Sequence, residues 1–209
     1  MPLPRYENLP EPRRRSILDA AAEEFGERGF ASASYNRIIE RAGISKGAMY
    51  YYFSDKDDLF RTVLEGALAE WFVKVGFPFA AHDAESFWEA CVDMYQRSLR
   101  FMLADRRNAA LCLEIARARQ RREGHAAIVA LNQRMAEWVH ELVSLGRSVR
   151  AVREDIPAEL AVHVALAMLD AGERWVTDHW TTIDETTVES SVRTLIDLSR
   201  GALAPKEKP

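Results

Sequence analysis

The chain has 209 residues, of which 48% are hydrophobic, and its formal net charge is −4. Its length suggests one medium domain or a small domain joined to a larger one, and its apolar content excludes an intrinsically disordered chain. Two cysteines are too few for a disulfide framework or a zinc site, and the first residues lack the apolar core of a signal peptide. We therefore expect a soluble, cytoplasmic protein with no cofactor and no metal.

Charge is distributed unevenly along the chain. Residues 1–54 contain 8 Lys and Arg against 7 Asp and Glu, a net charge of +1, whereas the remainder carries −5. The acidity belongs to the later part of the chain, but +1 is a weak electrostatic signature for a nucleic-acid-binding domain. A DNA-binding prediction must therefore depend on where particular residues stand.

The first expected elements are an arm and a helix. Residues 1–12 hold four prolines and no periodic pattern, which predicts a flexible arm. Pro12 suits the first turn of a helix, apolar residues then recur at helical spacing as far as Phe25, and Gly29 is expected to end the helix. The basic run Arg13–Arg15 suits either a solvated cluster or a contact to DNA phosphates or the minor groove.

Two short helices separated by a glycine follow. The first extends from Ser34 to Ala42 and ends at Gly43, and the second is capped by Ser45 and extends to Phe53. A helix as short as the second is marginal by itself, so tertiary packing must hold it. The residues expected to face inward are Ile38, Ile39, Ile44, Met49 and Phe53.

The outer side of the second short helix has residue types that suit DNA recognition. Gly47 and Ala48 are small enough for a close approach to the major-groove floor, and Lys46 can reach a guanine edge or a phosphate. Tyrosine hydroxyls and a lysine suit backbone phosphates, whereas Tyr51 is expected to face inward. The predicted DNA-binding residues are Ser34, Asn36, Ser45, Lys46, Gly47, Ala48, Tyr50, Tyr52 and Lys56.

The stretch that contains these helices resembles the DNA-binding domain of the TetR family of transcription regulators. The similarity is strongest over residues 42–59, AGISKGAMYYYFSDKDDL. Ala33, Asn36 and Ile39 depart from the Thr, Arg and Ala that are common in the family at these positions. The operator sequence therefore cannot be taken from the family.

The resemblance implies an all-α regulator of transcription and not an enzyme. It implies a helix-turn-helix DNA-binding domain over residues 13–60, a helical ligand-binding and dimerisation domain over 61–204, and a tail over 205–209. Such a protein binds a palindromic operator in double-stranded DNA as a homodimer. Repression by promoter occlusion is the expected mode, and whether the effector weakens or strengthens DNA binding stays open.

The later part of the chain predicts helices and no strand. The expected ranges are 54–75, 85–104, 108–120, 125–145, 157–176 and 185–203. The last two have apolar stripes too wide for burial on one side, so we assign them to the dimer interface. Ala165, Ala171 and Gly172 would permit close approach of the two copies, with Leu195 and Ile196 in the contact.

Aromatic and methionine side chains are concentrated in the same region. By default they belong to a core, but a cavity lined by them suits an apolar or aromatic small-molecule effector. The candidate ligand-binding residues are Trp88, Tyr95, Trp138 and Trp175. A basic run of Arg117, Arg119, Arg121 and Arg122 predicts a solvated helix end or, alternatively, a site for an acidic ligand.

Two other classes of function compete with a regulator. A small helical enzyme would need convergent titratable groups on the inner face of the later helices, and that face is mainly apolar. A dimeric interaction protein that has lost DNA binding would have the same sequence pattern, and only a binding assay separates it from a regulator.

Overall fold

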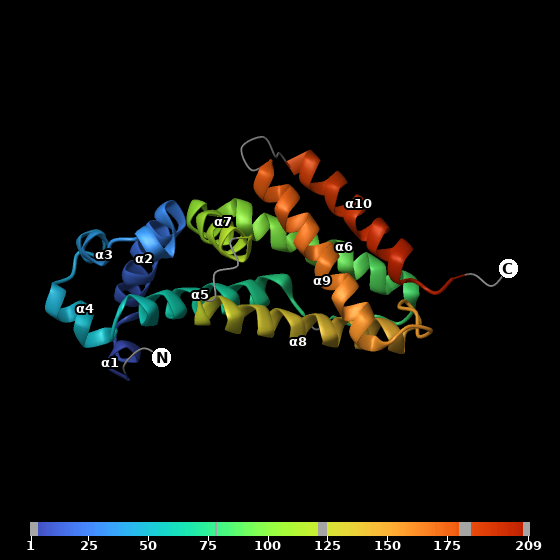
Figure 1. Cartoon of the computed structure of the whole chain (residues 1–209), viewed down its shortest axis with the longest axis horizontal. Coiled ribbons are helices and arrows are strands. Elements are labelled where there is room, and N and C mark those ends of the chain that lie inside the picture. Colours follow the sequence, from blue (N-terminus) through green and yellow to red (C-terminus); the bar gives the residue numbers. More distant parts are fainter. Residues whose placement is uncertain (1–3, 78, 121–124, 180–184, 207–209) are drawn as a thin grey trace. The chain divides into compact units, whose positions relative to one another are not determined.

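The computed structural model describes residues 4–77, 79–120, 125–179 and 185–206. Within these ranges the chain forms helices and no strand, which confirms the all-α prediction (Figure 1). The helices are α1 (Pro4–Glu7), α2 (Glu11–Ser32), α3 (Tyr35–Ala42), α4 (Lys46–Tyr52), α5 (Lys56–Val75), α6 (Ala84–Ala104), α7 (Arg106–Gln120), α8 (Ala126–Ser148), α9 (Ala158–Asp178) and α10 (Glu185–Leu203). None of these helices is long and apolar enough to cross a membrane.

The chain divides into two compact units, each built from two stretches of sequence. The head unit comprises residues 1–71 and 101–131, and the body unit comprises residues 72–100 and 132–209. The head unit therefore contains α7 in addition to α1–α4 and most of α5. A functional boundary at residue 60 stays a prediction, and that residue lies inside the head unit.

The head unit has a core of aromatic and aliphatic side chains. Phe25 and Phe60 are buried, with ring centroids 4.8 Å apart in an edge-on contact. Ile38, Ile39, Met49 and Phe53 are buried as expected, and Ile44 packs against the same core. Burial of these side chains holds the two short helices in place, because neither would be stable alone.

The N-terminal segment is more ordered than its prolines predict. Residues Pro4–Glu7 form α1, and the ring of Tyr6, only 6% exposed, packs 4.9 Å from that of Phe53. Burial raises the pKa of the Tyr6 hydroxyl to about 12. The expected flexible arm is therefore wrong at this point, because one buried aromatic ring provides enough apolar contact to fix a short helix.

Helices α2 and α7 touch through their backbones inside the head unit. A Cβ atom added at Gly26 of α2 would lie 2.4 Å from Cβ of Ala110 and 2.7 Å from its carbonyl carbon. No side chain larger than hydrogen fits between the helices at this point. The glycine in α2 is thus required by the approach of α7.

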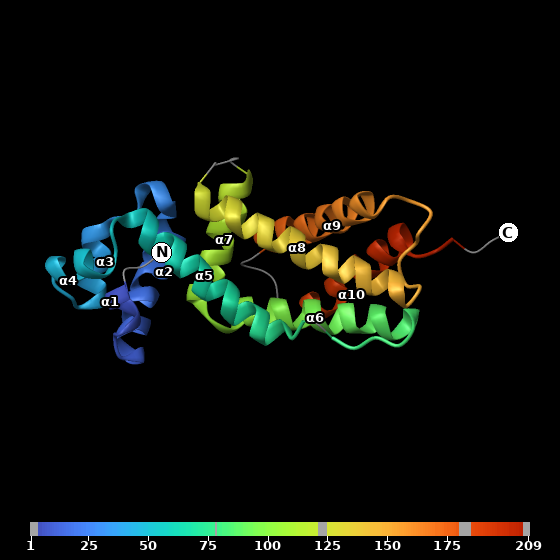
Figure 2. The same ribbon diagram turned by 90° about the horizontal axis from the view of Figure 1, so that it is seen from below.

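The body unit is a packed set of helices with α9 and α10 side by side (Figure 1) and α8 beside α9 (Figure 2). Gly172 of α9 accommodates side chains of the same chain: a Cβ there would lie 2.5 Å from both Leu195 Cδ2 and Tyr95 Oη. Ile196 is buried as well. At Gly172 the close approach is therefore made by side chains of the same chain, and the expected contact of Leu195 and Ile196 with a second copy stays a prediction.

Candidate nucleic-acid interface

Helices α3 and α4 are defined at their ends by side-chain caps and one glycine. Ser34 Oγ accepts a hydrogen bond from Arg37 N at 3.4 Å, and Ser45 Oγ accepts one from Ala48 N at 3.1 Å. Gly43 ends α3 in the left-handed conformation, with φ of 62°. Each of these features agrees with the sequence-based prediction of two short capped helices.

The outer side of α4 is exposed as a reading helix requires. Lys46 and Gly47 are exposed, and a Cβ at Gly47 would meet only Ser45 Oγ, at 4.0 Å. Tyr50 is 50% exposed, and its ring lies edge-on to that of Tyr35 with centroids 5.3 Å apart. Asn36 of α3 is exposed too. This surface offers one cation, small residues and a tyrosine ring without any rearrangement of the fold.

Tyr51 and Tyr52 differ from the prediction: Tyr51 is the exposed side chain and Tyr52 the partly buried one. Tyr51 is 49% exposed, and the guanidinium of Arg5 lies 4.4 Å from its ring centroid. Tyr52 is partly buried and packs against the core of the head unit. The expectation that Tyr51 faces inward is wrong. In a helix of seven residues, the inward face is set by neighbouring elements more than by helical period.

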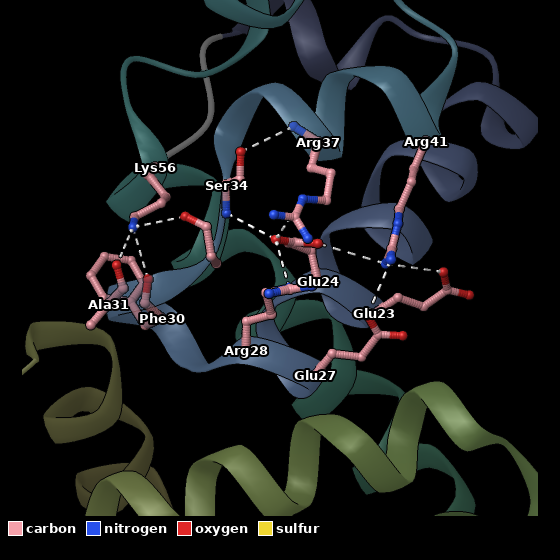
Figure 3. Close-up of polar contacts among 11 residues, drawn as sticks. Glu23, Glu24, Glu27, Arg28, Phe30, Ala31, Ser34, Arg37, Arg41 and Lys56 are labelled. Atoms are coloured by element: carbon pink, nitrogen blue, oxygen red, sulfur yellow. Dashed lines mark hydrogen bonds and ion pairs between the residues drawn. The ribbon is translucent and has the colours of Figure 1, made fainter.

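Lys56 binds the end of α2 (Figure 3). Its Nζ donates to the carbonyl oxygens of Phe30 at 2.8 Å, Ala31 at 3.3 Å and Ala33 at 3.2 Å. The ammonium group also lies 4.7 Å from the centroid of the Phe30 ring. An ammonium has three N–H groups, and all three are matched by these carbonyls, so a phosphate would have to displace one of them.

A buried carboxyl group fixes the start of α3. Glu24 of α2 is fully buried, and its Oε1 accepts a hydrogen bond from Ser34 N at 3.0 Å. Three guanidinium groups surround the Glu24 carboxyl, at 3.9 Å for Arg28 and 3.8 Å for Arg37 and Arg41 (Figure 3). Sequence reasoning missed this residue, although Glu24 stands seven residues after the buried Ile17, on the inward side of the helix.

Part of the basic cluster at the start of α2 is engaged within the protein. Arg13 donates through Nη2 to the carbonyl oxygen of Gly43 at 2.9 Å, and this bond joins the start of α2 to the end of α3. Arg15 is exposed and lies 3.9 Å from Glu11. Arg13 thus has a structural partner of its own, beside any contact that it makes to DNA.

The four aromatic ligand candidates in the body unit have different environments. Trp88 and Trp138 are buried, and Trp138 lies edge-on to Phe77 with centroids 5.7 Å apart. Burial, with Glu173 nearby, raises the pKa of the Tyr95 hydroxyl well above its usual value. Trp175 is partly exposed and stacks on His179 at 4.7 Å. Trp88 and Trp138 thus have the contacts of core residues.

A hollow in the body unit and the basic run that begins at Arg117 in the head unit also bear on ligand binding. A hollow of about 480 Å³ in the body unit lies between α8 and α9, with Ala136, His140, Val162 and His163 among its lining residues, and none of the four aromatic candidates lines it. In the basic run, Arg117 is exposed, whereas Arg121 and Arg122 lie outside the described residues.

Comparison with known proteins places the match on the head unit. The model of "Bacterial regulatory proteins, tetR family" matches residues 17–63. The chain is 42% identical over 52 residues to the transcriptional regulator AcrR of Shigella flexneri, a match that covers 25% of this chain and 24% of the relative. It is 42% identical over 62 residues to the transcriptional activator FasR of Mycolicibacterium smegmatis, which covers 29% of this chain and 28% of the relative. The chain thus matches about a quarter of the length of these relatives.

The fold of the whole chain has solved counterparts. A TetR family transcriptional regulator from Chloroflexus aurantiacus superposes with a TM-score of 0.68 over 99% of this chain and 100% of that chain, at 19% sequence identity. The helix-turn-helix geometry, the family match over residues 17–63 and the shared fold of the remainder agree with one another. Residues 17–63 thus match the tetR family of bacterial regulatory proteins, and the chain as a whole shares the fold of a solved TetR family regulator.

Proposed function

We propose that this protein is a ligand-responsive transcription regulator that binds a palindromic operator as a homodimer in the cytoplasm. The supporting observation is the exposed side of α4, where Lys46, Gly47 and Tyr50 are accessible while Met49 is buried in the core. One helix of seven residues reads few base pairs, so two copies related by a two-fold axis would be needed for a specific site. The DNA-binding residues named from the sequence belong to this proposal, with Lys56 supporting the fold of the reading helices.

The domain organisation is part of the same proposal. We place DNA reading in residues 13–60 and effector binding and dimerisation in residues 61–204. The exposed apolar side chains of α9 and α10 support a dimer there: Leu160 is 50% exposed and Leu198 is 59% exposed. These two leucines are candidates for the contact beside Leu195 and Ile196.

The effector that we propose is an apolar or aromatic small molecule. Tyr95 and Trp175 are the candidates with accessible surface, whereas Trp88 and Trp138 would line a cavity only if the core around them opened. Titration of aromatic compounds into the operator complex, followed by release of labelled DNA, tests this class. Release only by strongly charged compounds would move the site toward Arg117 and Arg119.

Selection of bound DNA from a random pool with the full chain tests operator recognition. The wild type should enrich a palindrome. Gly47→Leu should abolish enrichment without loss of thermal stability, because the added side chain enters open space on the reading face. Ala130→Leu, at an exposed position of α8, is the matched control and should enrich the wild-type site. Enrichment of the same site by Gly47→Leu at wild-type affinity would exclude α4 as the reading helix.

Assembly and mode of action are tested separately. Leu198→Lys should give a monomer in sedimentation, because it places a charge in an apolar contact. A persistent dimer of the double variant Leu160→Lys, Leu198→Lys would move the interface elsewhere. A promoter fused to a reporter measures the sign of regulation, which has to be determined directly because FasR is an activator.

A further inference from the structure

Four elements of the head unit meet at Phe30, in the last turn of α2. Its N–H donates to Oε1 of Glu114 in α7 at 3.2 Å, and its carbonyl oxygen accepts from Lys56 in α5 at 2.8 Å. Its ring lies 4.9 Å from that of Phe60 and 4.3 Å from that of His125, just before α8. A residue held at its donor, its acceptor and its ring has little freedom, so Phe30 fixes the path by which the chain leaves α2.

The backbone changes direction at Gly29, and the N–H of the next residue, Phe30, donates to the carboxyl group of Glu114. Gly29 has φ of 74° and ψ of 158°, so the chain leaves the helical path before Phe30. The Phe30 N–H then finds its acceptor on another helix. A Cβ at Gly29 would lie 3.1 and 3.3 Å from the two carboxyl oxygens of Glu114. The position therefore requires glycine for two reasons: its positive φ and the space that the carboxyl group occupies.

The close contact of α2 with α7 brings Glu114 to this point. Ala110 touches Gly26, and Glu114 follows Ala110 by one turn of α7, as Gly29 follows Gly26 by almost one turn of α2. Glu114 is only 2% exposed. A buried carboxyl group directed at a backbone N–H is costly to replace, since loss of the acceptor leaves a partly buried donor without this partner.

The turn over residues 29–34 sets the start of α3. Its far end is held by the hydrogen bond from Ser34 N to Glu24, and Ser34 caps α3 through its side chain. Two acidic side chains from two helices, Glu114 and Glu24, therefore bind backbone N–H groups at the two ends of this turn. A shift at either end moves α3, and α4 with it, because both helices pack on one core.

We infer that Glu114 is a positioning residue for operator recognition: through the Phe30 N–H it sets the direction in which α3 and α4 leave α2. This inference rests on the proposed DNA-binding function, and it extends the DNA-reading machinery to α7, which lies about fifty residues further along the chain. Glu114 is buried in the head unit, and it is not among the DNA-binding residues that the sequence predicts.

Three variants in α7 test the inference. Glu114→Gln keeps an oxygen acceptor in the same place and should bind the selected operator within about threefold of wild type. Glu114→Ala removes the acceptor and should weaken operator binding about tenfold or more. Leu111→Ala removes a buried side chain of α7 that lines a hollow with Leu18 and Val63, so it should lower thermal stability and leave operator affinity unchanged where the protein is folded. Binding to random DNA should be the same for all three.

Amide hydrogen exchange provides a readout that a general loss of stability does not imitate. Exchange at Phe30 should accelerate in Glu114→Ala relative to its neighbours in α2 and stay slow in Glu114→Gln and Leu111→Ala. If Glu114→Ala does not fold, Glu114→Asp, which withdraws the oxygens by one methylene, makes the same comparison.

Unchanged operator affinity in a variant with faster Phe30 exchange would overturn the inference, and so would unchanged exchange. A wild-type protein that selects no operator would instead refute the proposed function, and the exchange comparison would then decide alone whether Glu114 positions the turn.

Discussion

Glycines mark close contacts in both units, but the atoms that they meet differ. In the head unit, Gly26 faces backbone and Cβ atoms of Ala110, and Gly29 faces the buried carboxyl of Glu114. In the body unit, Gly172 faces the ends of Leu195 and Tyr95, and Gly146 faces the side chains of Val152 and Phe87. Backbone cannot move aside without moving a helix, whereas side-chain ends can rotate.

The comparisons with relatives differ along the chain. The matches to AcrR and FasR extend over 52 and 62 residues at 42% identity, whereas the fold shared with a solved regulator covers 99% of the chain at 19% identity. Contacts to backbone specify residues such as glycine, whose replacements do not fit. Contacts between side chains specify total volume, and many residue combinations fill the same volume.

The largest effect should come from alanine at Gly26, and Gly172 in the body unit provides the comparison. Gly26→Ala should destabilise the protein by about 2–3 kcal/mol, because its Cβ overlaps backbone of α7. Gly172→Ala should cost about 1 kcal/mol or less, since Leu195 and Tyr95 can rotate. Urea unfolding measures both. Equal losses would show that the two contacts are equally rigid and would remove the contrast between the units.

Substitutions of Lys56 and Lys46 in the head unit should affect different properties, the first the stability of the fold and the second DNA binding. Lys56→Met keeps the aliphatic stem but leaves three carbonyl groups without their donor, so it should lower the free energy of unfolding by about 1–3 kcal/mol. Lys46→Met, at an exposed position, should leave stability unchanged and weaken operator binding. A stable Lys56→Met protein with a reduced salt dependence of binding would restore the phosphate role predicted for Lys56.

Thiol reactivity should differ between the units. Burial raises the pKa of Cys91 to about 12, so this body-unit thiol should resist iodoacetamide at pH 8 until the protein unfolds. Cys112 of α7 is partly buried and should react first. Mass spectrometry of the alkylated peptides identifies the site. Early labelling of Cys91 would indicate that the core of the body unit opens readily.

The smallest effect should come from a surface ion pair in the body unit. Arg200 lies 2.6 Å from Glu85, and the hydrogen bond and charge of Arg200 lower the pKa of this carboxyl. A lowered folded-state pKa stabilises the protein above the ordinary Glu pKa, and this contribution is lost as the pH falls through the folded-state value. Glu85→Gln should therefore reduce the Tm slightly at pH 7 and not at pH 3. A pH-independent difference would assign the effect to packing.

Local sequence patterns predicted the helices well and their distant partners poorly. The ends of α3 and α4 followed from Ser34, Gly43 and Ser45, whose effects act over three or four residues. The roles of Glu24, Lys56 and Glu114 could not be predicted in this way. Each binds the backbone of residues outside its own helical pattern, and a local sequence pattern does not identify such distant partners. The same limit explains Gly172, whose neighbours Tyr95 and Leu195 are distant in sequence.

The backbone contact between Gly26 and Ala110 bears on how proteins with this fold can be recombined. A chimera that joins residues 1–60 to a foreign sensor would separate Gly26 from Ala110 and the Phe30 N–H from Glu114. It would expose the face of α2 that packs against α7, and a fragment of 60 residues has too small a core to bury that face by repacking. A working graft should therefore transplant residues 101–131 together with the N-terminal segment, so the exchangeable module is discontinuous in sequence.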